Sequence, residues 1–245
     1  MIRNATYNEI MEDYCESILN GEIVACKLVI KAVQKFVDEL ERSEKHEPDF
    51  PYVFDRNAVE RFCSVFPAFL VHSKGKFAGN PFELSPWQVF VTANIFGWKH
   101  RETNLRRIQK VLLSVARKNG KTTYCSGLEL IFTFLDGEAG AEVYTSATKL
   151  EQAKLIHDEA ERMLKQSPFL MRHAQVYKNN ISFPKTNSFA RPLGSDKPFD
   201  GLNQHATFID EFHAWLERHR KFYNTITTGS GSREQPFSMI ITTGS

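Results

Sequence analysis

The spacing of apolar and polar positions changes most sharply around residue 115. Before that point, the apolar run Val111–Leu113 is resumed by Val115, and this predicts a strand buried on both faces. A polar loop follows at residues 117–120. The next apolar positions recur with the period of a helix that ends at Asp136-Gly137: Leu128, Ile131, Phe132 and Leu135. The pattern here is strand, polar loop and helix.

The region before this point is helical in pattern. Helical spacing predicts helices over residues 7–20, 23–40 and 57–69, the last capped by Asp55, and Ser85-Pro86 is typical of a further helix start. A charged stretch and Gly- and Pro-containing turns separate these segments. We therefore expect a helical N-terminal appendage over residues 1–80 and a second domain over residues 81–245.

Beyond residue 140, short apolar strands alternate with helical patterns. The predicted strands are residues 142–147, 175–177, 181–183, 188–192, 206–209 and 237–245, and the predicted helices are residues 149–165 and 215–228. Such alternation predicts an α/β fold with a mostly parallel sheet and helices on both faces. Because the chain ends on an apolar strand with no following helix, we expect a domain truncated at its C-terminal end.

The junction between the first predicted strand and its helix has the pattern of a phosphate-binding loop. Gly120, Lys121 and Thr122 match the end of G-x-x-x-x-G-K-[ST], but Val115 occupies the first glycine position. A helix start carries free N–H groups and partial positive charge, which favour phosphate. Lys121 is then expected to reach the β/γ-phosphates and the Thr122 hydroxyl to ligate Mg²⁺. The alternative is an ordinary turn with a surface lysine.

Two adjacent carboxylates, Asp210 and Glu211, end the predicted strand at residues 206–209. Such a pair suits ATP hydrolysis, with Asp210 holding Mg²⁺ and Glu211 polarising the attacking water. A capped strand end is the alternative, but the phosphate-loop pattern upstream favours the functional interpretation. We interpret the flanking His205 and His213 as structural.

Two other stretches carry weaker signals. The amide of Gln88, in the first turn of a predicted helix, has the donor and acceptor that match the adenine edge, or it is simply solvated. The basic residues between 101 and 110 offer contacts to DNA phosphates, although a solvated connector is the preferred interpretation.

Composition narrows the class of protein. The 245 residues carry a net charge of +2 and are 42% hydrophobic, enough for a sizeable core. The four cysteines, Cys15, Cys26, Cys63 and Cys125, lie too far apart for a metal site, so we expect buried free thiols in a reducing compartment. With no signal-peptide pattern and no apolar run of transmembrane length, we expect a soluble intracellular protein.

Together these motifs resemble the large subunit of tailed-bacteriophage terminases of the HK97-like type. The resemblance runs over essentially the whole chain and rests on NGEIVACKLVIKAV, LSPWQVFVTANIFGW, VARKNGKTT, TSATKLEQAK, ARPLGSDKPFDGLN, FIDEFHAW and the terminal TTGS. It implies a P-loop NTPase domain of the RecA-like, ASCE type, which pumps viral DNA into a procapsid. The family's C-terminal RNase H-like nuclease domain is missing here, so we expect no nuclease activity from this chain.

The resemblance also implies roles for individual residues. Gln88 corresponds to the adenine-reading glutamine, Asp210 to the Mg²⁺ aspartate and Glu211 to the catalytic base. The nucleotide-binding loop comprises Arg117, Lys118, Asn119, Gly120, Lys121, Thr122 and Thr123. The motif that couples hydrolysis to movement is Thr242, Thr243 and Gly244. An arginine finger is expected in cis or from a neighbouring subunit, with Arg117 and Arg191 as the candidates.

The implied cofactors are ATP and Mg²⁺. The implied partners are double-stranded viral DNA, the portal protein, the small terminase subunit and further copies of the chain in a ring on the portal, in the host bacterial cytoplasm and with no membrane. Two alternatives stay open: an SF2-helicase-like DNA-dependent ATPase, and a non-catalytic module that docks on the portal and small subunit. Glu211 argues against the second.

Overall fold

The computed structural model describes residues 5–196 and 201–243, and it divides into two compact units. The first comprises Met1–Phe66 and Glu83–Ile108, and the second comprises Pro67–Phe82 and Gln109–Ser245. This division differs from the boundary predicted at residue 80. The helix that starts at Pro86 belongs to the first unit, because its Phe90 packs edge-on against Phe36 of the N-terminal helices.

The first unit consists of helices around a short antiparallel pair of strands. Its elements are α1 (Tyr7–Leu19), α2 (Lys27–Glu44), β1 (Tyr52–Phe54), most of α3 (Arg56–Phe69), α4 (Pro86–Gly97) and β2 (Trp98–His100). Asp55 caps α3 as predicted, because its Oδ1 accepts a hydrogen bond from the Ala58 N–H at 3.0 Å. The core is aromatic, with Phe36 in edge-to-face contact with Phe54 and Trp98.

The second predicted helix begins later than its apolar pattern indicates. The pattern started at Ile23, whereas α2 starts at Lys27 and Ile23 bonds back to the Ser17 carbonyl in a turn. Gly21 has a φ of +77°, which ends α1 and turns the chain. Val24 is consequently 98% exposed.

The basic connector is structural, which corrects the expectation of solvated charges. Arg107 makes a bidentate ion pair with Glu39, with N–O distances of 2.6 and 2.8 Å, and its guanidinium lies over the Trp98 ring. Arg106 is buried over Phe96, and Arg101 donates to the Ser43 carbonyl. These guanidinium groups therefore hold the first unit together.

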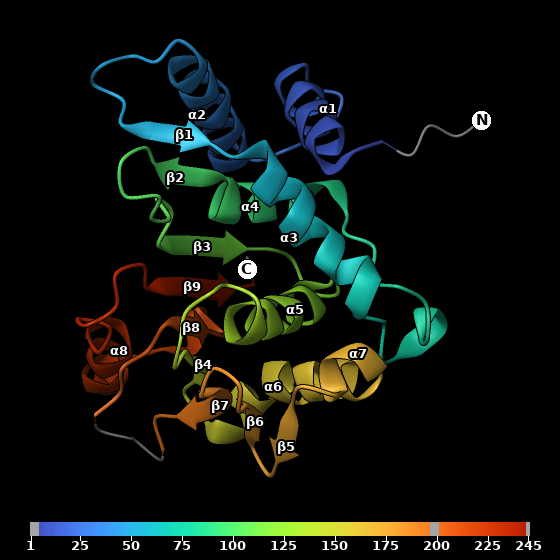
Figure 1. Cartoon of the computed structure of the whole chain (residues 1–245), viewed down its shortest axis with the longest axis vertical. Helices are drawn as coiled ribbons and strands as arrows, with labels where there is room; N and C mark the ends of the chain where they lie inside the picture. The colour runs from blue at the N-terminus through green and yellow to red at the C-terminus, as the bar shows by residue number, and fades with distance from the viewer. Residues whose placement is uncertain (1–4, 197–200, 244–245) are drawn as a thin grey trace. The chain divides into compact units, whose positions relative to one another are not determined.

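The second unit is built on a seven-stranded sheet in the order β3-β9-β8-β4-β7-β6-β5 (Figure 1). The strands are β3 (Lys110–Ser114), β4 (Glu142–Ala147), β5 (Gln175–Tyr177), β6 (Asn180–Phe183), β7 (Ser188–Gly194), β8 (Ala206–Ile209) and β9 (Phe237–Thr242). The first five in sheet order are parallel, and β6 and β5 add an antiparallel hairpin. The helices are α5 (Lys121–Phe134), α6 (Leu150–Lys165), α7 (Pro168–Met171) and α8 (Arg220–Thr228).

Helices cover both faces of this sheet, which confirms the predicted α/β fold class. Neighbouring residues of a strand point to opposite faces. Phe208 of β8 contacts Phe132 of α5, whereas Ile209 packs in a cluster with Phe222 and Ile226 of α8. The carboxyl ends of the parallel strands therefore emerge between these two helical layers.

Two predicted elements differ from the structure. Leu113 of β3 is buried but Leu112 is 66% exposed, because β3 is the edge strand rather than a strand buried on both faces. The helix predicted at residues 215–228 forms only as α8, since residues 212–219 form the 3₁₀ turns η2 (Phe212–Ala214) and η3 (Glu217–His219).

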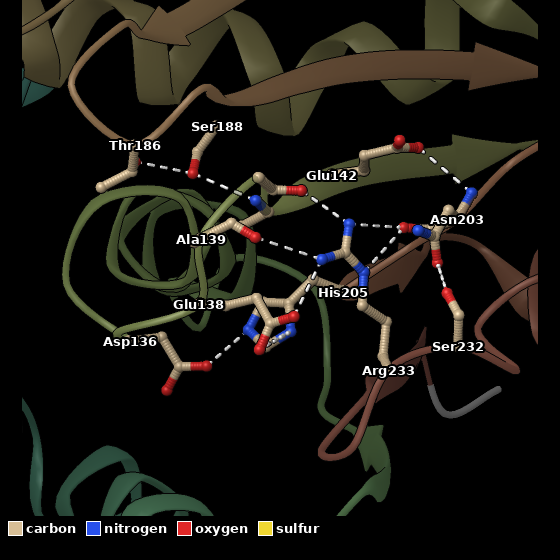
Figure 2. Close-up of polar contacts among 12 residues, drawn as sticks. Asp136, Glu138, Ala139, Glu142, Thr186, Ser188, Asn203, His205, Ser232 and Arg233 are labelled. Carbon is tan, nitrogen blue, oxygen red and sulfur yellow. Dashed lines mark hydrogen bonds and ion pairs between the residues drawn. The ribbon is translucent and has the colours of Figure 1, made fainter.

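Arg233 stabilises the edge of the sheet at which the parallel strands begin. Its guanidinium donates to Glu138 at 2.8 Å and to the carbonyls of Ala139, Gly140 and Asn203 (Figure 2). These groups precede β4 and β8, and Arg233 itself precedes β9. One side chain thus ties together the amino ends of three adjacent parallel strands.

The cysteines follow the prediction with one exception. Cys15, Cys63 and Cys125 are buried, but Cys26 is exposed at the start of α2. Burial raises the pKa of the Cys15 thiol to about 12. Across residues 5–196 and 201–243, none of the helices combines the length and apolar character that crossing a membrane requires.

Candidate active site

The predicted phosphate loop lies between β3 and α5 in the second unit. Lys118 and Gly120 adopt left-handed backbone conformations with φ of +66° and +75°, which turns the chain sharply into the helix. α5 then begins at Lys121, so the first N–H groups of this helix have no intrahelical acceptors. A strand-to-helix turn of this kind directs backbone donors at one point and suits an anion.

Lys121 and Asp210 both lie at the carboxyl edge of the sheet. Both residues are buried, with Lys121 8% exposed and Asp210 4% exposed. Burial raises the pKa of the Asp210 carboxyl, and the nearby positive charge of Lys121 acts in the opposite direction. The structure thus brings together two groups that lie far apart in the sequence.

Asp210 is held from several sides. Its N–H donates to the Ser146 carbonyl of β4 at 2.8 Å, and its carbonyl accepts from the Trp215 indole at 3.1 Å. The Gln152 amide, in the first turn of α6, donates to Asp210 Oδ2 at 3.4 Å. The sequence does not predict this role of Gln152, because a polar residue in an ordinary helical pattern gives no sign of what it contacts.

Glu211 follows Asp210 in a strained backbone conformation. Its φ and ψ are both 48°, in the left-handed region that costs a residue with a Cβ about 1–2 kcal/mol. Its carboxylate lies 3.2 Å from His213 Nε2. His213 was interpreted as structural, yet the structure places it in direct contact with the candidate catalytic base.

The end of β9 lies between the phosphate loop and the acidic pair. Thr242 accepts the Val115 N–H through its carbonyl at 3.2 Å, and its hydroxyl lies 3.3 Å from His213 Nδ1. The Thr243 hydroxyl lies 3.5 Å from the same nitrogen. The third predicted coupling residue, Gly244, lies outside the described residues. β9 thus contacts both the start of the loop and the partner of Glu211.

The two candidate arginine fingers have different surroundings. Arg117 is exposed in the phosphate loop. Arg191 lies in the middle of β7, not at its end, where Nε donates to Asn180 at 2.9 Å and the guanidinium lies over the Phe189 ring. β7 is also separated from β8 by β4. Arg117 therefore belongs to the same loop as Lys121, whereas Arg191 lies within a strand on the other side of β4.

Gln88 belongs to the first unit and caps its own helix. Its Oε1 accepts the Ser85 N–H at 2.8 Å in a capping box, and the residue is buried at 4% exposure. The solvated alternative is therefore wrong. The predicted role in adenine recognition stays a prediction.

A cavity of about 430 Å³ adjoins the first turn of α5 within the second unit. Its lining includes Thr122 and Thr123, and its charged walls come from α6 and the loop before α4. There Glu159 accepts hydrogen bonds from Ser73 and Arg162 and pairs with Lys74 at 3.5 Å. The helix start that bears the phosphate-loop threonines therefore opens into space large enough for part of a ligand.

Comparison with known proteins identifies the family. Residues 86–245, more than half of the chain, match the family model for the terminase large subunit, ATPase domain. The chain is 27% identical over 190 residues to the terminase large subunit of Enterobacteria phage HK97, covering 76% of this chain and 35% of that protein.

The solved structure of one relative shows the same fold. The crystal structure of the HK97 bacteriophage large terminase is similar with a TM-score of 0.64 and 22% identity, over 75% of this chain and 37% of that one. The large terminase of a thermophilic bacteriophage, in complex with ATP-gamma-S, has a TM-score of 0.44 and 17% identity, over 55% of this chain and 32% of that one. The chain spans about a third of the length of these relatives. On the match over residues 86–245, this chain belongs to the family of terminase large subunit ATPase domains.

Proposed function

We propose that this chain hydrolyses Mg²⁺-ATP and that the hydrolysis drives translocation of double-stranded viral DNA into a procapsid. One observation carries the proposal. Lys121 at the head of α5 and Asp210 at the end of β8 lie within electrostatic range of each other, with Glu211 next to Asp210. This is the arrangement that binding of a triphosphate and activation of water require.

The phosphate loop binds the charged end of the nucleotide. The N–H groups at the start of α5 and the Lys121 ammonium supply donors and positive charge for the β- and γ-phosphates. Because Lys121 is buried, little water screens its charge. Its electrostatic attraction to a bound phosphate is therefore stronger than that of an exposed lysine.

The oxygen donors at this edge fit Mg²⁺. The Thr122 hydroxyl and the Asp210 carboxylate are hard oxygen ligands, and Gln152 orients Asp210 through Oδ2. When bound, Mg²⁺ neutralises the charge that develops on the phosphate oxygens. The fit rests on the donor chemistry of these two residues.

Glu211 is the proposed general base. A carboxylate beside the metal-holding aspartate can orient the attacking water and take its proton. We also propose Arg117 as the arginine finger, because it lies in the phosphate loop, whereas Arg191 is held within β7 by Asn180 and Phe189.

The proposed setting follows from membership of the family. The chain acts in the host bacterial cytoplasm with double-stranded viral DNA, the portal protein and the small terminase subunit, as one member of a ring on the portal. Thr242, Thr243 and Gly244 couple hydrolysis to movement of the DNA in this proposal.

A steady-state assay of phosphate release, with and without duplex DNA, tests the proposal. We expect Mg²⁺-dependent hydrolysis that duplex DNA stimulates. Lys121→Ala should abolish nucleotide binding in calorimetry, since the loop loses its ammonium group. A chain that binds ATP equally well with and without Lys121, or that releases no phosphate under any of these conditions, would contradict the proposal.

A further inference from the structure

His213 contacts two parts of the site at once. Its Nε2 lies 3.2 Å from Glu211 Oε2, and its Nδ1 lies 3.3 Å from the Thr242 hydroxyl and 3.5 Å from the Thr243 hydroxyl. The imidazole therefore stands between the candidate general base and the end of β9.

The chemistry of these partners indicates which ring nitrogen carries the proton. A carboxylate is attracted to the Nε2–H group of an imidazole, and the 3.2 Å separation between Nε2 and Glu211 Oε2 is short enough for this attraction to act. In the neutral imidazole, Nδ1 then accepts from a threonine hydroxyl. The imidazole thus contacts the carboxylate on one side and a threonine hydroxyl on the other.

The backbone at Glu211 makes such a partner useful. The left-handed conformation at φ +48° is strained, and residues in such conformations persist only where their surroundings hold them. The Glu211 side chain is only 25% exposed, and His213 limits its rotamers from one side. A base must be aimed at the reacting water to act efficiently.

We propose that His213 is a positioning residue, which orients the Glu211 carboxylate and links it to the hydroxyls at the end of β9. A displacement of Thr242 or Thr243 would then move the base, so that events at β9 and the rate of hydrolysis depend on each other. This inference rests on the proposed ATPase function.

Steady-state kinetics of His213 variants test the positioning role. His213→Ala should lower kcat by about 100-fold, the scale of a misplaced catalytic group, with KM for Mg²⁺-ATP nearly unchanged. His213→Gln, which keeps a donor and an acceptor, should recover part of the loss. The matched control is His173→Ala, an exposed histidine of the same unit that lies after α7, which should keep wild-type kcat and KM.

A double-mutant cycle tests the link to β9. The double substitution Thr242→Val and Thr243→Val should lower kcat when His213 is present but much less in the His213→Ala background. The reason is that the threonine hydroxyls act on Glu211 through the His213 imidazole. Full additivity would overturn the link. Wild-type kcat in His213→Ala, with its melting temperature retained, would overturn the positioning role. Neither result would affect the proposed function, which is tested separately by phosphate release from the wild-type chain and by ATP binding of Lys121→Ala.

Discussion

The surroundings of Asp210 favour binding of a cation to its carboxylate. Its surroundings exclude water and raise its pKa, while Lys121 and the Gln152 amide favour the charged form. A carboxylate that is poorly solvated and already oriented gains more from an incoming cation than one in water. The residue is therefore arranged for ligand binding, although its burial disfavours its own ionisation.

Gln152 should accordingly control the Mg²⁺ requirement. We predict that Gln152→Leu raises the Mg²⁺ concentration for half-maximal hydrolysis by about tenfold, the scale of lost outer-shell hydrogen bonds. The measurement is the rate of phosphate release against free Mg²⁺. Glu151→Gln, on the same turn but exposed, is the control and should not change the requirement. An unchanged Mg²⁺ profile in Gln152→Leu would show that the 3.4 Å contact has no role.

The residues that local pattern could predict differ in kind from those it could not. Lys121, Asp210 and Glu211 were predicted because a loop before a helix and a strand end have local sequence signatures. Gln152 and His213 were not, because their roles depend on contacts between separate elements. Their side chains are ordinary for a helix and a turn.

At the scale of elements, a buried ionic pair joins the helix of the phosphate loop to its neighbour. Glu129 of α5 and His157 of α6 are both fully buried, with Oε1 and Nδ1 2.6 Å apart. Burial lowers the pKa of His157, but the Glu129 charge and hydrogen bond outweigh it, so the pKa is raised overall. The positions of α5 and α6 are thus coupled by charge as well as by packing.

This pair predicts a particular pH dependence of stability. Because the folded-state pKa of His157 is raised, its contribution is fully present below the unfolded pKa of about 6.5 and is lost as pH rises through the folded pKa. The unfolding free energy of wild type should therefore exceed that of His157→Gln most at about pH 6, and the difference should shrink towards about pH 9. Glu129→Gln should remove this dependence. A difference that is constant with pH would contradict the charged pair.

Arg233 should matter for stability and not for chemistry. We predict that Arg233→Met lowers the unfolding free energy by about 3 kcal/mol, because Glu138 and half-buried carbonyls lose their donor. Denaturant unfolding measures this directly. Arg220→Met, which removes an exposed pair with Glu217, should change stability by less than about 0.5 kcal/mol. Equal effects of the two substitutions would refute the role of Arg233.

Element boundaries were predictable where caps and glycines have local signals, as at Asp55 and Gly120. They were less predictable where tertiary contacts decide. The helix predicted at residues 215–228 loses its first residues, since Trp215 instead donates to the Asp210 carbonyl and packs on Phe222. The edge position of β3 likewise depends on sheet order, which apolar spacing alone does not encode.

At the scale of the whole molecule, the candidate site lies in the second unit at the carboxyl ends of parallel strands, where the loops of α/β sheets commonly bind ligands. The phosphate loop, the acidic pair and the end of β9 come from three adjacent strands, β3, β8 and β9. Sheet order therefore assembles the site from distant parts of the sequence (Figure 1).

The arginine finger can act within its own subunit or in the site of a neighbouring subunit. We predict that Arg117→Ala lowers kcat by about 10³-fold and that Arg191→Ala stays near wild type. Mixing Arg117→Ala with Glu211→Gln should give no more hydrolysis than the two variants separately if Arg117 acts in cis. A large loss in Arg191→Ala, with recovery on mixing it with Glu211→Gln, would instead show that Arg191 acts in a neighbouring subunit.

The central claim is that this site binds ATP and that Glu211 activates water within it. Single-turnover hydrolysis, with protein in excess over ATP, tests the claim on the wild type and on Glu211→Gln, with calorimetry to measure binding. We predict equal affinity for Mg²⁺-ATP and a rate of phosphate release at least about 100-fold lower in Glu211→Gln, since the amide keeps the shape but cannot take the proton. Near-normal phosphate release from Glu211→Gln would contradict the account.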